Sequence, residues 1–177
     1  KNNYSIPGEV YSSDLTKAYS PAWFSGIHTN LITVSATTWG SANGEKRNGA
    51  SWQSAPFSES LANFSNFSAR KANIITVGAP GVHMYSLSHT SDTGYITKQG
   101  TSMATPVVSG LAALIIGIND NLSPEEVVNI IKTNTDNTSG TDLANSNYVG
   151  SGRINALKAV NAALNSTIKI TSPTNNP

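Results

Sequence analysis

The pattern of apolar and polar positions in the first 100 residues predicts three strands separated by irregular segments. Residues 30–37 (NLITVSAT) and 73–81 (NIITVGAPG) are apolar, rich in β-branched side chains and flanked by turn residues, which favours buried strands. Residues 94–100 (GYITKQG) alternate between apolar and polar and are bounded by glycines, which predicts a third strand. The segment 39–60 and the stretch between the second and third strands are expected to be loops.

The long apolar run after Ser102 predicts a helix that ends at about Ile118. Its apolar and small residues fall on every side of the helix, namely Ala104, Val107, Val108, Leu111, Ala112, Ala113, Leu114, Ile115 and Ile118. The run is short for a bilayer and contains Pro106 and Gly110, so we interpret it as a core helix and not as a membrane span. Each large apolar side chain left in water forgoes roughly 1.5–3 kcal/mol of burial energy. This helix therefore needs neighbours on all sides.

Two further helices are predicted near the C-terminus. One begins at Ser123, which is expected to cap it together with Glu126 in a capping box, with Pro124 in the first helical position. Its apolar stripe consists of Val127, Val128, Ile130 and Ile131. The other covers 155–165 (NALKAVNAALN), with Asn155 as its cap. Its expected apolar face consists of Leu157, Val160 and Leu164. Residues 139–152 between the two helices are expected to be a loop.

Strands of this buried type belong to parallel sheets that are covered by helices on both faces, which predicts an α/β fold. Two such strands are too few for the sheet, and the helix after Ser102 lacks enough partners. The sequence therefore predicts that part of the domain is not on this chain.

Composition narrows the function classes. Hydrophobic residues make up 38% and charged residues 12%, and the net charge is +1, so neither nucleic acid nor an anionic membrane is expected as a partner. The chain has no cysteine, which excludes disulfides, thiolate metal sites and cysteine nucleophiles within it.

Residues 100–106 (GTSMATP) resemble the nucleophile motif of the subtilisin-like serine proteases, the subtilases. Other segments resemble the family in the same order along the chain, to about residue 165: 20–24 (SPAWF), 30–37 (NLITVSAT), 61–68 (LANFSNFS), 78–82 (GAPGV), 122–135 (LSPEEVVNIIKTNT) and 150–163 (GSGRINALKAVNAA).

The resemblance implies a three-layer α/β subtilisin-like fold with a mainly parallel sheet, incomplete on this chain. Residues 1–166 would be the C-terminal half of the catalytic domain, and 167–177 a strand stub and a linker-like tail. The implied function is secreted serine endopeptidase, acting on peptide or protein substrates through an acyl-enzyme on Ser102. The backbone N–H of Ser102, at a helix start, would donate to the oxyanion.

The rest of the family's catalytic machinery is missing from the sequence. The chain has neither the family's glycine-flanked Asp motif nor its His-Gly-Thr-His motif, and we interpret His28, His83 and His89 as surface or packing residues. No Ala-Gly-Asn turn frames Asn2 or Asn3, so the oxyanion asparagine is missing as well. The expected partner is therefore an N-terminal half that carries the base, the orienting acid and this donor, and the chain alone is expected to be inactive.

Three other interpretations were weighed. Ser102 would have no chemical role if it only capped the helix. An α/β-hydrolase elbow requires Gly-x-Ser-x-Gly, and Ala104 stands where the second glycine would be. A catalytically inactive subtilase-fold module with a binding or chaperone-like role is the alternative that this half of the domain leaves open.

No cofactor is required by the expected chemistry, although the resemblance admits a structural calcium ion. The candidate carboxylates are scattered, so no metal ligands are assigned among Asp14, Asp92, Asp120, Asp136 and Asp142. Thr76 stands where the family often carries Asp.

Overall fold

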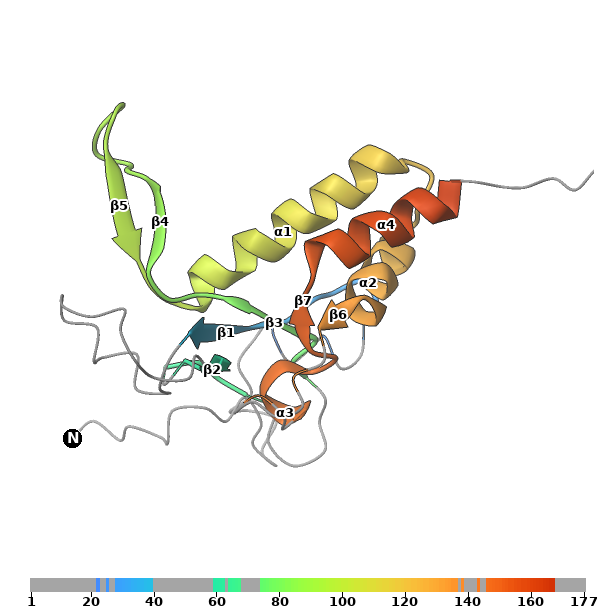
Figure 1. Ribbon diagram of the computed structural model, residues 1–177, viewed down its shortest axis with the longest axis horizontal. Coiled ribbons are helices and arrows are strands. Elements are labelled where there is room, and N and C mark those ends of the chain that lie inside the picture. The colour runs from blue at the N-terminus through green and yellow to red at the C-terminus, as the bar shows by residue number, and fades with distance from the viewer. Residues whose placement is uncertain are drawn as a thin grey trace, which may run out of the picture.

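The computed structural model describes residues 22, 25, 28–39, 59–62, 64–67, 74–136, 138, 143 and 146–167. The elements are β1 (Val34–Trp39), β2 (Glu59–Leu61), β3 (Val77–Pro80), β4 (Met84–Leu87), β5 (Tyr95–Lys98), α1 (Thr101–Ile118), α2 (Pro124–Thr133), β6 (Thr135–Asp136), α3 (Ser146–Val149), β7 (Arg153–Ile154) and α4 (Ala156–Thr167). Figure 1 shows their arrangement. The tail from residue 168 onward lies outside the described residues.

A five-stranded sheet in the order β2-β1-β3-β7-β6 forms the centre of the molecule. The inner pairs β1–β3 and β3–β7 are parallel, and the edge strands β2 and β6 run antiparallel to their neighbours. The predicted buried strands become β1 and β3 at the middle of this sheet. The expected α/β class with a mainly parallel sheet is confirmed.

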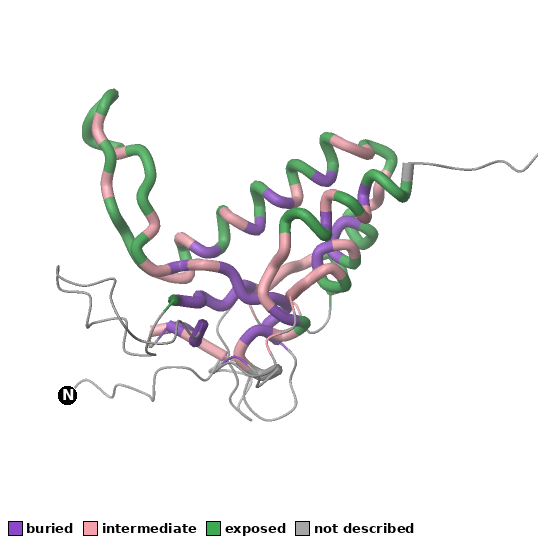
Figure 2. Tube along the Cα trace, viewed as in Figure 1, coloured by how far each residue is buried: buried purple, intermediate pink, exposed green. Residues whose placement is uncertain are grey.

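The two faces of the sheet differ in chemistry. Val34, Ala36, Val77 and Ala79 alternate toward one face and pack in the core with α1, α2 and α4. Gly78 faces the opposite side, where an added Cβ would lie 2.5 Å from Cγ1 of Val149 in α3. Figure 1 accordingly shows α1, α2 and α4 on one side of the sheet and α3 on the other, and Figure 2 shows the burial concentrated in β1 and β3. Among the described residues, the second face is only partly covered.

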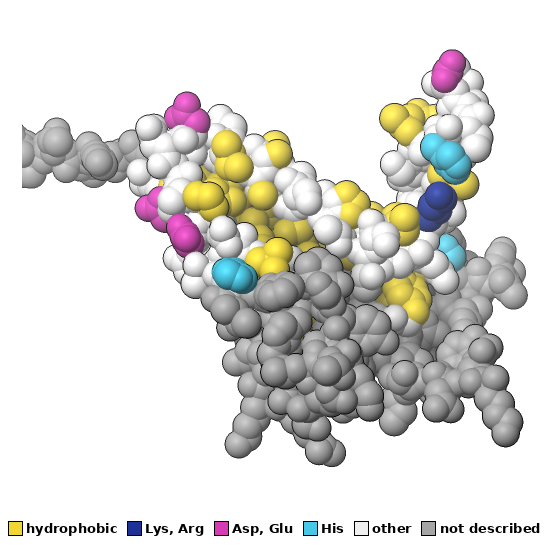
Figure 3. All heavy atoms as spheres, turned by 180° about the vertical axis from the view of Figure 1, so that it is seen from behind, with side chains coloured by type: hydrophobic (Ala, Val, Ile, Leu, Met, Phe, Trp, Pro, Cys, Tyr) yellow, Lys and Arg dark blue, Asp and Glu magenta, His cyan; other side chains and the backbone are white. Residues whose placement is uncertain are grey.

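One side of α1 packs in the core and the other does not. Ala104, Val108, Leu111 and Ile115 are buried, whereas the side chains of Leu114 and Ile116 remain 58% and 48% exposed. Figure 3 shows apolar side chains exposed along this helix. By length and composition α1 could cross a membrane, but its buried stripe contacts the sheet, α2 and α4, as expected of a core helix. The burial on all sides that the sequence predicts is not reached within the described chain.

The other long helices confirm their predicted caps and correct one predicted face. Ser123 and Glu126 form the capping box of α2, and the Asn155 side chain accepts from the Lys158 N–H at 2.9 Å at the start of α4. Of the predicted apolar face of α4, Val160 packs against the core, but Leu157 and Leu164 were wrong because they are 71% and 46% exposed. The buried residues are instead Ala159 and Ala163, whose small side chains let α4 lie close to α1.

Five short or exposed elements were not predicted. A hairpin of β4 and β5 projects from the body beside α1 (Figure 1), where only β5 was predicted. Tyr85 and Tyr95 stack on it with their ring centroids 5.0 Å apart. Strand β2 begins within 39–60 and ends at Leu61, and α3 lies within 139–152, two segments that were expected to be loops. The short strands β6 and β7 were also missed.

Candidate active site

Ser102 lies in the first turn of α1, where the chain enters the helix from the hairpin. The Gly100 N–H donates to the Gly81 carbonyl oxygen at 2.8 Å, which closes the base of the hairpin. Gly100 has φ of 147°, a conformation that side-chain-bearing residues rarely adopt. Gly100 is the N-cap of α1 and no side chain caps the helix, so the interpretation of Ser102 as a simple cap is wrong.

The helix start presents unpaired donors beside an exposed hydroxyl. The N–H groups of Met103 and Ala104 turn back to the Gly100 carbonyl oxygen at 2.9 and 3.3 Å. For the Ser102 N–H no acceptor is found in the described part of the chain. The side chain of Ser102 is exposed, and the first turn carries no acidic residue. The positive end of the helix dipole therefore lies in the same turn as the Ser102 N–H and its exposed hydroxyl.

The three histidines lie in separate places. His28 is exposed ahead of β1, His83 is exposed at the base of the hairpin with φ of 54°, and His89 is exposed in the hairpin turn. The structure does not gather them into one site. Asn2 and Asn3 lie outside the described residues.

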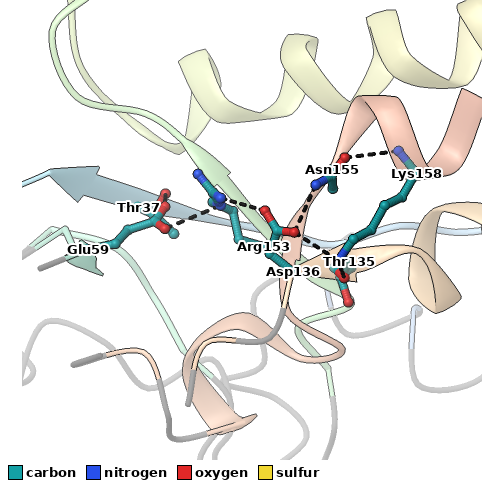
Figure 4. Close-up of polar contacts among 7 residues, drawn as sticks. All are labelled: Thr37, Glu59, Thr135, Asp136, Arg153, Asn155 and Lys158. Carbon is teal, nitrogen blue, oxygen red and sulfur yellow. Dashed lines mark hydrogen bonds and ion pairs between the residues drawn. The ribbon is translucent and has the colours of Figure 1, made fainter. Parts of the chain in front are cut away.

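A polar cluster that the sequence analysis missed lies on the face of the sheet opposite to α1. The Thr37 hydroxyl donates to Oε1 of Glu59 at 2.9 Å, and Oε2 of Glu59 lies 3.2 Å from Nε of Arg153. This second contact is an ion pair whose N–H is not aligned for a hydrogen bond. Figure 4 shows the side chains reaching one another from β1, β2 and β7. Gly78 on β3 is paired with Arg153 of β7. A Cβ at Gly78 would lie 3.1 Å from Cγ2 of Thr37, so the glycine leaves room for that side chain.

The cluster continues from Arg153 to the start of α4. Arg153 also pairs with Asp136 at 2.5 Å, and the other oxygen of Asp136 accepts from Asn155 at 2.8 Å and Lys158 at 3.0 Å. The hydrogen bond from Asn155, with those from Lys158 and Arg153, lowers the pKa of Asp136 to about 2. Asp136, one of the scattered carboxylates in the sequence, thus joins β6, β7 and α4.

Glu59 is the buried member of this cluster. It is 7% exposed, and this burial raises the pKa of its carboxyl, while the hydrogen bond from Thr37 and the charge of Arg153 act in the opposite direction. The guanidinium carbon of Arg153 also lies 5.9 Å from the centroid of the Trp39 ring. No local pattern identified these partners because they come from distant segments of the chain.

A separate cleft lies at the amino ends of β1 and β3, whereas Ser102 lies beyond the carboxyl end of β3. Its volume is about 670 Å³, and it is lined among others by His28, Thr76, Glu125 and Lys132. The Thr76 hydroxyl accepts from the Thr33 N–H at 3.0 Å. Within the described part of the chain, no three His, Asp or Glu side chains lie together as a metal site. Structural calcium stays a prediction without assigned ligands.

Comparison with known proteins identifies the family to which this chain is similar. The model of the subtilase family (peptidase S8) matches residues 3–152. Subtilisin DY of Bacillus licheniformis is 35% identical over 158 residues, which cover 86% of this chain and 54% of that protein. The extracellular basic protease of Dichelobacter nodosus is 38% identical over 112 residues, or 58% of this chain and 17% of that protein.

A solved structure gives the same fold. Fervidolysin from Fervidobacterium pennivorans, a keratinolytic enzyme related to subtilisin, superposes with a TM-score of 0.59 at 22% identity, covering 80% of this chain and 20% of that one. This likeness concerns the fold alone. The chain spans about half the length of subtilisin DY and smaller shares of the other two proteins. The family match, the identity to subtilisin DY and the shared fold together show that this chain belongs to the subtilase family.

Proposed function

We propose that this chain supplies the nucleophile of a serine endopeptidase. The observation that carries the proposal is the exposed Ser102 in the first turn of α1, directly after the bend at Gly100, in a chain of the subtilase family. A serine hydroxyl at this place lies at the positive end of the helix dipole and is exposed, so a substrate carbonyl can reach it.

The proposed reaction proceeds through an acyl-enzyme. Oγ of Ser102 attacks the peptide carbonyl while a histidine takes its proton, and the Ser102 N–H donates to the oxyanion. The same histidine then protonates the leaving amine, so the C–N bond breaks and an ester to Ser102 remains. Water, deprotonated by the histidine, hydrolyses that ester and restores the hydroxyl.

The histidine, the aspartate that orients it and a second oxyanion donor are assigned to an N-terminal half that packs on this chain. Two observations support this partner: the exposed apolar side chains of Leu114 and Ile116 on α1, and the coverage of about half of subtilisin DY. Without a base the Ser102 hydroxyl is a weak nucleophile, so this chain alone is expected to be inactive.

Secretion is part of the same proposal and is supported by the extracellular basic protease among the relatives. The substrate is a peptide or protein. The chemistry requires no cofactor, and neither nucleic acid nor a membrane is proposed as a partner.

The test combines this chain with its N-terminal half. The assembled domain is expected to hydrolyse a peptide substrate and to be acylated at Ser102 by a fluorophosphonate, as located by peptide mass spectrometry. The Ser102→Ala variant should assemble equally well and lose both activities, whereas this chain alone should show neither. Hydrolysis that survives in Ser102→Ala would reject the assignment. An assembled domain that binds peptides without hydrolysis or acylation would favour the inactive binding module.

A further inference from the structure

Thr37 joins the polar cluster to the peptide segments that hold Ser102. On one side its hydroxyl donates to Glu59, which is buried in the cluster. Through its main chain it contacts a different segment, because its carbonyl oxygen accepts from the Gly81 N–H at 3.0 Å. Thr37 is itself 1% exposed, so both bonds lie away from solvent.

The bond to Gly81 is the first of three that lead to the nucleophile. The Gly81 carbonyl oxygen accepts from the Gly100 N–H at 2.8 Å, and the Gly100 carbonyl oxygen accepts from Met103 and Ala104 at the start of α1. Gly81 and Gly100 each donate through the N–H and accept through the carbonyl oxygen, so the series of bonds links Thr37 to the first turn of the helix. Ser102 lies within that turn.

The cluster restrains Thr37 more firmly than a single hydrogen bond does. Oε1 of Glu59 holds the hydroxyl while Oε2 faces Arg153, so the carboxylate is fixed at both oxygens. Arg153 is fixed in turn by Asp136. A charged acceptor in a buried setting makes a strong, directional hydrogen bond.

Catalysis depends on this kind of restraint. A nucleophile must be held within a fraction of an ångström of its productive position, by residues that are themselves locked by packing and hydrogen bonds. From the series of bonds we infer that Thr37, clamped by Glu59 and Arg153, is a positioning residue for Ser102 that acts through Gly81 and Gly100. This inference rests on the proposed function of Ser102.

Thr37→Val in the assembled domain tests the inference, because it removes the hydroxyl and keeps the shape. It should lower kcat and the rate of fluorophosphonate acylation by about tenfold, with KM changed less than about twofold. Thr37→Ser keeps the hydroxyl and should restore most of the rate. The matched control is Thr38→Val, the same change at the next residue, whose buried hydroxyl has no partner among the described residues.

Glu59→Gln provides a second route if Thr37→Val does not fold at the assay temperature. The amide keeps an acceptor for Thr37 and loses the charge that faces Arg153, so kcat should fall by less than in Thr37→Val. Where both variants fold, the double variant should lose less than the product of the two single losses, as residues in one network do.

A defined set of kcat values would overturn the inference. Equal kcat in Thr37→Val and Thr38→Val, with kcat unchanged in Glu59→Gln, would show that the cluster stabilises the fold without positioning Ser102. The same outcome with a dead Ser102→Ala variant leaves the proposed function intact. Survival of activity in Ser102→Ala rejects the proposed function itself, whatever the Thr37 variants do.

Discussion

At the scale of single residues, the absence of a side chain at Gly81 lets three segments meet. A Cβ at this position would lie 2.6 Å from Cβ of Ala36 and 2.9 Å from the Gly100 carbonyl oxygen. Both neighbours are held by the sheet and by the hairpin base, so neither can retreat without moving the entry to α1. Gly81→Ala should therefore lower the unfolding free energy of the assembled domain by about 1–3 kcal/mol, the usual range for overpacking.

Urea denaturation at neutral pH measures this loss, and acylation of Ser102 shows whether the entry to α1 has moved. Gly117→Ala is the control, because a Cβ there meets no described atom within 4 Å and alanine favours the helix. Equal stability of Gly81→Ala and wild type would contradict the close packing at this point.

Asp136 gives a second residue-scale prediction, on acid stability. Its pKa is about 2 in the folded chain, below its ordinary value of 3.8, so the ionised carboxylate stabilises the folded state. This contribution is complete above about pH 4 and is lost as the pH falls toward about 2. The difference in urea midpoint between wild type and Asp136→Asn should shrink steadily over that window. A difference that is constant with pH would rule out this role. Glu59 has the opposite pH dependence: its pKa is raised in the folded chain, so its contribution to stability is present at low pH and is lost as the pH rises.

Residue-scale prediction from sequence succeeded where the signal was local and failed where it was not. The Ser123 capping box and the Asn155 cap are each read from a few consecutive residues, whereas the role of Ser102 stays a prediction. The cluster of Glu59, Arg153 and Asp136 has no such signal. Its members meet only because β2, β1, β3, β7 and β6 lie side by side, and that order cannot be derived from spacing along the chain.

At the scale of elements, the start of α2 provides a direct test of capping. The Ser123 hydroxyl accepts from the Glu126 N–H at 3.3 Å, and the Glu126 carboxylate accepts from the Ser123 N–H at 2.7 Å. Ser123→Ala should lower the unfolding free energy by about 1 kcal/mol, because it leaves one donor of the first turn without a partner. Thermal unfolding measures the loss, and Ser123→Thr, which keeps a capping hydroxyl, should remain close to wild type. Equal losses in the two variants would mean that the cap contributes nothing.

The predicted and missed elements differ in length and in exposure. Long helices and the two central strands have enough periodic positions to be recognised, and all of them were predicted. Strands β6 and β7 have two residues each, too few for any period. Strand β4 is mostly exposed, and its apolar residues Met84, Tyr85 and Leu87 do not alternate with polar ones. The two leucines of the predicted α4 face were wrong for another reason: close contact with α1 favours the small buried Ala159 and Ala163, and the leucines lie outside that contact.

At the scale of the whole molecule, helices cover one face of the sheet, but apolar side chains on the outer sides of those helices remain exposed. The apolar face of the sheet is covered by α1, α2 and α4. The outer side of α1 presents Leu114 and Ile116 to solvent near its C-terminal end, while Ser102 lies in its first turn. Apolar residues that favour burial and the proposed nucleophile lie on the same helix, so one partner would satisfy both requirements.

Two exposed leucines on different helices separate this idea from ordinary surface exposure. Leu114 on α1 is 58% exposed and Leu157 on α4 is 71% exposed, so a charge at either position changes this chain alone very little. If the N-terminal half covers α1, Leu114→Glu buries an unpaired carboxylate on assembly and should weaken association of the halves by at least about tenfold. Leu157→Glu should associate as wild type does. Titration of labelled halves measures both constants, and recovery of peptidase activity should follow the same order. Equal association of the two variants would leave the exposed side of α1 without its proposed partner.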